Sequence, residues 1–562
     1  MMKKNLLAAS LAVALGSLSG GAAAAWSVND QGIGHYNLVP YYTVQEGSNT
    51  LINIVNTDTD DGKIVKVRFR AAEWSDDALD FQVFLSPGDV WTAAVGVEGG
   101  VPKLVSEDKS CTLPADLGAG KAFPTTRVEG RDAEKLFEGY VEIFVMADIP
   151  RQAQTLTGGG LVYNNGGKPN PLYTASKHVA GVAPCTPTVI GSGLLAHNTL
   201  QTTSEGVNVA PADRDVTAIS AADLLLPENQ RTWMKPATGG LMTNVTIIKV
   251  DSSRAFAIPA TAIAGDAADV SSVQYFRQSD TVLALTDTQA RSVTADRLFY
   301  SAGADPLTLK NDLDATTAEK RGAAYPAYEF DMPDLSTPFV AGGNARTHRD
   351  TLAALLNNSA KAAVEYLIEP GLKATTDVVF SQPMRRYFYD YTPVATASGF
   401  NRTIPGSANA VKTFKVAGQD NSVYQGITLA NLLPMTMSSF YDREEQSGTS
   451  GIVVSPSEPG DPVALKGEVS VISVKNGSVP TGSLGAKLTA NNWEFAEAYT
   501  SGWATLSLAA ATSLSGDPLK TAPAPEASVN LPVIGFSAIN IFNAAAGAAG
   551  TNYGMINPLR KF

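Results

Sequence analysis

The stretch that decides the fold is "KIVKVRFRAAEWSDDALDFQVFL" (63–85), which contains two alternating runs. Successive side chains of a β-strand point to opposite faces of a sheet. The alternation therefore predicts antiparallel strands with one apolar face and one face in water. On the apolar face we expect Val65, Val67, Phe69, Leu79, Phe81, Val83 and Leu85, and on the wet face Lys66, Arg68 and Arg70.

Turn residues separate the alternating runs of this first region. "QEGSN" (45–49), "DTDDGK" (58–63) and "SPGD" (86–89) carry the Gly, Pro, Asn and Asp that tight turns favour. "EGYVEIFVMADI" (138–149) is the last clear strand of the region. Strands at this spacing predict an antiparallel β-sandwich of immunoglobulin-like or jelly-roll kind over residues 26–190.

The rest of the chain is also predicted to be mostly β, in further domains with few short helices. Residues 191–395 form a β-rich middle region with one short helix expected within 349–370, where leucines recur at helical spacing. In this region, 241–263 is predicted to be a hairpin that turns at Asp251, Ser252 and Ser253. Residues 396–562 form a C-terminal β-rich region with a flexible Ala/Gly tail, "FNAAAGAAGTNYGMINP" (542–558).

Residues 1–25 have the pattern of a secretory signal peptide. Lys3 and Lys4 precede a short apolar run, and Ala23-Ala24-Ala25 provides a small-residue cleavage site before Trp26. The apolar run is shorter than the roughly 20 residues that a spanning helix needs, and no later segment is predicted to be a transmembrane helix. We therefore expect an exported protein, at the cell surface or outside the cell.

The charge balance narrows the range of partners. The chain has 42 Lys and Arg against 54 Asp and Glu, and removal of the leader gives a net charge near −14. An acidic surface argues against nucleic acid or anionic lipid as a partner. It favours solubility, and divalent cations as counterions.

The two cysteines, Cys111 and Cys185, are expected to pair as a disulfide in an oxidising compartment. The alternatives are two free thiols, or a metal site that would include the neighbouring His178.

A calcium loop is the one cofactor site that the sequence suggests. "NTDTDDGK" (56–63) does not match an EF-hand, because its sixth residue is Asp61 instead of Gly and its twelfth is Val67. A looser calcium site formed by Asp58, Asp60 and Asp61 stays open. The alternative is a plain hairpin turn in which Gly62 adopts positive φ.

No catalytic motif is found, so the chain is not predicted to be an enzyme. The four histidines lie outside any H-E-x-x-H pattern, and no G-x-S-x-G elbow occurs. Paired carboxylates for glycoside hydrolysis need only spatial proximity. Asp442, Glu444 and Glu445 are the candidates, with Tyr441 as a platform for sugar stacking, and the alternative is a solvated turn.

Several motifs resemble a family of uncharacterised exported proteins of Gram-negative bacteria. They include "FLSPGDVWTA" (84–93), "DKSCTLP" (108–114), "KHVAGVAPC" (177–185) and "YDREEQ" (441–446), and the similarity spans most of residues 30–475. The family is described as cell-surface or surface-layer-like. Its pattern contains both cysteines, which implies their pairing. The chain departs from the pattern in "TDVVFSQP" (376–383).

The leading functional hypothesis is therefore an exported cell-surface structural protein that self-assembles as a surface-layer or filament subunit. Its expected partner is another copy of the chain, in a homo-oligomer or a lattice. One alternative is a carbohydrate-binding or adhesive protein that contacts surface glycans. A second alternative is a secreted hydrolase.

Overall fold

The structure is a computed structural model of the whole chain. It describes most of residues 26–190, 233–265, 361–383, 434–508 and 533–561, with a few short strands between these ranges. The described part is mostly β, in several antiparallel sheets with very few helices, as the sequence predicts. The predicted leader (1–25) lies outside the described residues.

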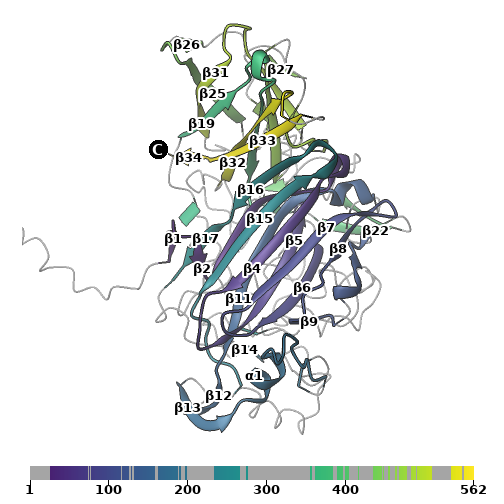
Figure 1. Cartoon of the computed structure of the whole chain (residues 1–562), viewed down its shortest axis with the longest axis vertical. Helices are drawn as coiled ribbons and strands as arrows, with labels where there is room; N and C mark the ends of the chain where they lie inside the picture. Colours follow the sequence, from purple (N-terminus) through teal and green to yellow (C-terminus); the bar gives the residue numbers. More distant parts are fainter. Residues whose placement is uncertain are drawn as a thin grey trace, which may run out of the picture.

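The first sandwich consists of two sheets, drawn in purple to teal in Figure 1. Sheet 1 has the order β1 (Ser27–Asn29), β17 (Thr261–Ala264), β3 (Tyr36–Thr43), β11 (Glu138–Ile149), β5 (Gly62–Ala71), β6 (Asp77–Leu85), β9 (Cys111–Leu113). Sheet 2 has the order β10 (Lys121–Ala122), β8 (Val101–Val105), β7 (Val90–Glu98), β4 (Asn49–Asn56), β15 (Leu241–Lys249), β16 (Arg254–Pro259), and β2 (Ile33–Gly34) also pairs with β15.

The predicted hairpin at 241–263 is confirmed, but it belongs to the first sandwich. β15 and β16 pair through a short 3-10 turn (Val250–Ser252), and Ser253 adopts the left-handed conformation. β15 pairs with β4, and β17 pairs with β3. The first sandwich is thus built from both sides of residue 190, and the boundary predicted there does not separate its strands.

The apolar face of β5 lies in the core, as predicted. Phe69 stacks on Phe81, with ring centroids 6.4 Å apart, and Phe81 contacts Trp91 at 5.4 Å. All three rings are almost fully buried.

The opposite face of β5 corrects the sequence prediction. Lys66, Arg68 and Arg70 are fully buried, so this face is not in water. In the register of the sheet, Arg70 lies beside Tyr140 of β11, whose hydroxyl donates to the carbonyl of Pro383 at 3.2 Å. Pro383 follows β20 (Thr375–Ser381) of the second sandwich. A segment distant in sequence therefore packs onto the face that local alternation marks as polar.

A small subdomain extends from one end of the first sandwich, at the bottom of Figure 1. It contains the hairpin β12 (Gln152–Thr157) and β13 (Val162–Pro169), followed by helix α1 (Pro171–Ser176). Asn170 caps α1 by accepting from the Leu172 amide at 3.0 Å. Of the range 349–370, in which a helix is expected, Leu355 and Leu356 are helical, and the other residues up to 360 lie outside the described part. Its second half forms strand β19 (Lys361–Leu367) instead of helix.

The second sandwich also has two sheets, at the top of Figure 1. Sheet 3 has the order β26 (Ser447–Gly448), β25 (Pro434–Asp442), β31 (Ser501–Leu508), β19 (Lys361–Leu367), β34 (Arg560–Lys561), with β28 (Val463–Ala464) beside β25. Sheet 4 has the order β27 (Val453–Ser455), β30 (Ala490–Glu494), β29 (Val469–Lys475), β20, β32 (Ile534–Asn543), β33 (Thr551–Pro558). β29 and β30 run parallel, whereas the other pairs are antiparallel.

This sandwich corrects two further expectations. It combines 361–381 with segments after 434, so the boundary predicted at 395 crosses it. The segment expected to be a flexible tail supplies β33, which pairs with β32 from residue 551 to residue 558. The Ala/Gly run "AAAGAAG" (544–550) before the strand is typical of a flexible tail, but the backbone of 551–558 completes sheet 4.

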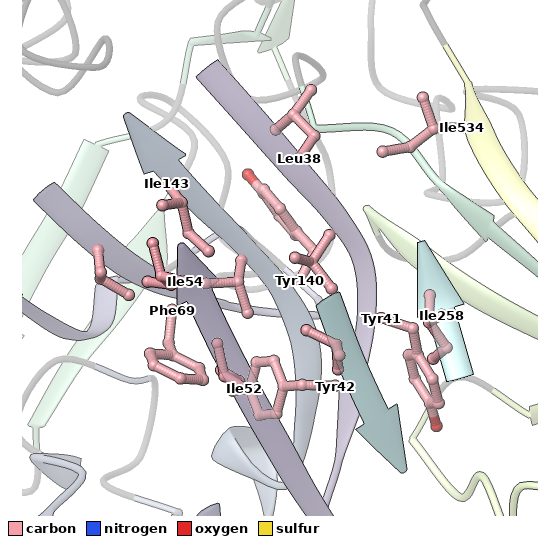
Figure 2. Packing of buried hydrophobic residues seen from close by; sticks show 14 of the residues in the cluster. Leu38, Tyr41, Tyr42, Ile52, Ile54, Phe69, Tyr140, Ile143, Ile258 and Ile534 are labelled. Carbon is pink, nitrogen blue, oxygen red and sulfur yellow. The ribbon is translucent and has the colours of Figure 1, made fainter. Parts of the chain in front are cut away.

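The two sandwiches pack against each other. Figure 2 shows this region, with Leu38 and Tyr41 on β3, Ile258 on β16 and Ile534 on β32, all of them buried. Gly554 of β33 approaches β16 so closely that a Cβ there would lie 2.2 Å from the Ala255 carbonyl oxygen. Only glycine allows the two backbones to approach this closely.

Short ladders and turns complete the described structure. The ladders pair β14 (His197–Asn198) with β18 (Gln274–Tyr275), β21 (Tyr389–Asp390) with β24 (Lys415–Val416), and β22 (Thr392–Thr396) with β23 (Gly399–Thr403). Further 3-10 turns lie at Gln45–Gly47, Leu117–Ala119, Ala133–Leu136 and Pro370–Leu372.

Candidate functional site

The predicted disulfide between Cys111 and Cys185 is confirmed. Cys111 begins β9, Cys185 follows α1, and their Cα atoms lie 5.3 Å apart. The Cys185 amide also donates to the Ala175 carbonyl of α1 at 2.9 Å. The bond therefore fastens the small subdomain to the edge of sheet 1.

The predicted calcium loop forms a tight turn between β4 and β5. Asp58 accepts from the amides of Asp60 and Asp61 at 2.9 and 3.1 Å. Asp60 is exposed and is not among the acids that cluster here. Gly62 lacks the positive φ that the hairpin alternative required, and it serves instead for close packing, since a Cβ there would lie 2.8 Å from the Leu85 carbonyl oxygen.

The structure brings a different set of three acids together: Asp58, Asp61 and Asp148. One carboxylate oxygen from each lies within 4.8 Å of the others. Asp148 comes from the end of β11, far from the loop in sequence. The sequence marks Asp148 only as an acid near the end of the apolar run "EIFVMADI" (142–149). Alternation there predicts a strand, but it does not indicate which residues Asp148 contacts.

A lysine ammonium occupies the space between two of these carboxylates. Lys63 Nζ lies 2.9 Å from Asp58 Oδ2 and 2.7 Å from Asp148 Oδ1, and it donates to Thr238 Oγ1 at 2.9 Å. Lys235 pairs with Asp61, and its backbone forms a two-bond bridge with Asp148 at 3.0 Å. Two ammonium groups thus face three carboxylates.

The pKa values at this cluster follow from burial and from the lysines. Burial raises the pKa of Asp148 above its usual range, against the opposing effect of Lys63. Partial burial acts in the same direction on Asp58, but hydrogen bonds from Lys63 and the turn amides outweigh it and lower its pKa. Burial alone would lower the pKa of Lys235, yet Asp61 raises it. Charged lysines therefore already supply the positive charge that these acids need.

A calcium ion at this cluster would have to displace Lys63, whose side chain is fully buried. Hard oxygen ligands suit calcium, but an ammonium ion in hydrogen-bond contact with two of them competes for the same oxygens. Calcium binding by Asp58, Asp60 and Asp61 stays a prediction, and the contacts point to a structural ion-pair cluster.

A second layer of buried charge lies on the far face of β5. Glu142 of β11 accepts from Arg70 Nε at 3.0 Å and from the Tyr36 hydroxyl at 2.9 Å, and Arg68 Nη1 lies 3.8 Å away. Lys66 pairs with Asp80 of β6. Buried charges tolerate desolvation only when they are paired and hydrogen-bonded. The sequence displays these residues, but not their burial.

His35 is the buried histidine of the first sandwich. Its ring contacts Trp26 edge-on, with centroids 5.1 Å apart, and Nδ1 accepts from the Gly265 amide at 3.3 Å. Burial and the nearby Lys63 lower its pKa to about 4, because both disfavour a charged imidazole. His35 is therefore neutral at pH 7.

The candidate acids Asp442, Glu444 and Glu445 lie at the end of β25. Asp442 Oδ1 accepts from the Glu444 amide at 2.9 Å, and Glu445 has a φ of 63°. These contacts describe a capped turn. The predicted platform residue, Tyr441, stacks on Trp503 of β31 with ring centroids 4.6 Å apart and an interplanar angle of 16°.

A groove of about 360 Å³ lies where the two sandwiches meet. Strand β1 and the turn after it form one wall of the groove, and residues of β15, β16 and β17 also line it. The second sandwich contributes Phe536 and Pro558 to the lining. Ligand sites often occur at such junctions. The groove borders β1, the edge strand of sheet 1.

Within the described residues, no helix has the length and apolar character needed to cross a membrane. Comparison of the chain with family models, with curated proteins and with solved structures finds no match. The resemblance to surface-layer-like proteins therefore stays a prediction that rests on the motifs.

Proposed function

We propose that this protein is an exported structural subunit of the cell surface that works by self-association. The observation that best supports this proposal is the set of buried contacts that joins its two sandwiches. A subunit of a lattice or filament must transmit load without bending at its domain junctions, and buried contacts across the junction oppose such bending.

Buried polar contacts hold this junction. The Glu138 carboxylate at the start of β11 accepts from the Tyr41 hydroxyl at 2.8 Å and from the amides of Leu488 and Lys487 at 2.9 and 3.2 Å. The Val469 amide donates to the Ala72 carbonyl at 3.1 Å. Such bonds fix the orientation of the two bodies, because buried polar groups tolerate few alternative arrangements.

The edge strand β1 offers a route to self-association. It pairs with β17 over three residues on one side, and Val28 is 37% exposed. An open strand edge beside a groove can accept an extended segment from a neighbouring copy.

The test is the assembly state of the chain without its predicted leader. Sedimentation velocity and electron microscopy over a wide concentration range, with and without calcium, should reveal ordered oligomers. Val28→Lys should weaken them, because a charge on an edge strand opposes pairing. Val97→Lys is the matched control, since Val97 of β7 is exposed to a similar degree, 44%. A protein that stays monomeric at every concentration in both conditions would refute the proposal.

A further inference from the structure

The outer face of sheet 3 carries an unusual row of side chains. The strand register places Tyr441 of β25, Trp503 of β31 and Glu365 of β19 side by side across three strands. Trp503 is 40% exposed, Glu365 is exposed, and Tyr441 is half-buried. One face of the indole stacks on Tyr441, and Glu365 lies on the next strand in the other direction.

The next row on the same face carries smaller side chains. Register places Ser439, Thr505 and Ala363 in line, with Arg560 of β34 beyond Ala363. Ser439 Oγ and Thr505 Oγ1 are hydrogen-bonded at 2.7 Å. Thr505 in this row is buried, and the row ends at the exposed Arg560.

The exposed indole is not needed to fill the core of the second sandwich. Ala504, the next residue of β31, points inward and is buried, as is Phe440. Phe440 stacks on Phe495 with centroids 4.7 Å apart, and Tyr499 contacts Phe440 at 4.6 Å. The core is thus closed beneath Trp503, which leaves the indole available to a ligand.

We propose that this face of sheet 3 binds a neutral polysaccharide, with one sugar ring stacked on Trp503. The C–H groups on one face of a pyranose ring are apolar and weakly positive, and they pack on the electron-rich face of an aromatic ring. The hydroxyl groups at the ring edge need donors and acceptors. Glu365 can accept from them, and Arg560 can donate to them.

Charge favours this ligand over others. The chain has a net charge of −12, and Glu365 flanks the platform, so an anionic polymer meets repulsion there. A neutral sugar meets no such repulsion. This binding is separate from the proposed self-association, which involves β1 of the first sandwich.

The test is affinity gel electrophoresis of the folded chain in gels that contain a neutral β-glucan, a mannan or a galactan. At least one polysaccharide should retard the wild-type protein. Trp503→Ala should weaken the binding roughly tenfold, which corresponds to the loss of about one stacking contact. Trp503→Phe should bind with intermediate affinity, since it keeps a smaller ring and the strand.

Tyr553→Ala is the matched control, because Tyr553 is 50% exposed but lies on β33 of sheet 4. Its retardation should equal that of the wild type. Thermal melting of each variant separates loss of binding from loss of folding. Unchanged retardation of a folded Trp503→Ala variant would overturn the proposal. So would the absence of retardation in all three gels, or a Trp503-dependent dimer in place of sugar binding.

Discussion

The far face of β5 and the outer face of sheet 3 contrast in an instructive way. On β5 the charged residues Lys66, Arg68 and Arg70 are fully buried, whereas on sheet 3 the indole of Trp503 is 40% exposed. Side chains of β5 and of β31, which carries Trp503, alternate between the two faces of their sheets, as in any pleated strand. Alternation therefore tells which residues share a face, but a neighbour distant in sequence decides whether that face meets water.

A Glu→Gln substitution on each face tests this comparison most sharply. The substitution on the buried face should cause the larger loss of stability. Glu142→Gln removes the negative charge that faces Arg70 and Arg68. Loss of one partner in a buried ion pair typically destabilises by about 3–5 kcal/mol. Urea denaturation measures the free energy of unfolding. A loss below about 1 kcal/mol would mean that water reaches this face.

Removal of the disulfide should cause the next largest loss of stability. The double variant Cys111→Ser, Cys185→Ser removes the link between two residues that are 74 positions apart in the sequence. The chain-entropy model predicts a loss of about 4 kcal/mol. Because the bond fastens the small subdomain, limited proteolysis should cut that subdomain before the sandwiches. Simultaneous cleavage of both regions would contradict this assignment.

His35 gives the next effect, through its pKa of about 4. The unfolded chain protonates this histidine near the ordinary pKa of 6.5, whereas the folded chain resists protonation until about pH 4. The folded state therefore loses stability as the pH falls from 6.5 to 4, by roughly 3 kcal/mol in total.

The measurement is the pH dependence of unfolding, compared between the wild type and His35→Gln. The variant should show a flatter curve in that window, and the difference between the curves isolates His35 from the carboxylates. Parallel curves would show that the imidazole is accessible to water.

The smallest effect is expected on the exposed face. Glu365→Gln is chemically the same change as Glu142→Gln, but Glu365 is exposed on β19. Surface substitutions of this kind usually change stability by less than about 0.5 kcal/mol. The same urea experiment checks it. A large loss would indicate that the outer face of sheet 3 is covered in solution.

The candidate sites also include parts that the sequence predicts and parts that it does not. Cys111 and Cys185 could be paired from the sequence, because a chain with two cysteines and a predicted leader leaves few alternatives. The acid cluster could be predicted only in part. Asp58, Asp61 and Lys63 are local to one turn, but Asp148 reaches them only through the pairing of β11 with β5.

Strand positions were mostly available from the sequence, and strand neighbours were not. "EGYVEIFVMADI" (138–149) is β11, residue for residue, and the hairpin at 241–263 forms as expected. That β15 would complete sheet 2 next to β4 could not be seen, since nothing local to 241–249 distinguishes one partner strand from another. The C-terminal strand β33 was hidden because the Ala/Gly run before it is typical of a flexible tail, and the close packing at Gly554 becomes visible only in the structure.

The sequence by itself determined the mostly β architecture, most strand positions and the cysteine pair, because these depend on side-chain period, turn chemistry and the count of cysteines. The tertiary structure alone decided which strands share a sandwich, which charges are buried and which aromatic rings face outward. These outcomes depend on contacts between different strands, many of them far apart in the chain, for which alternation within one strand carries no information.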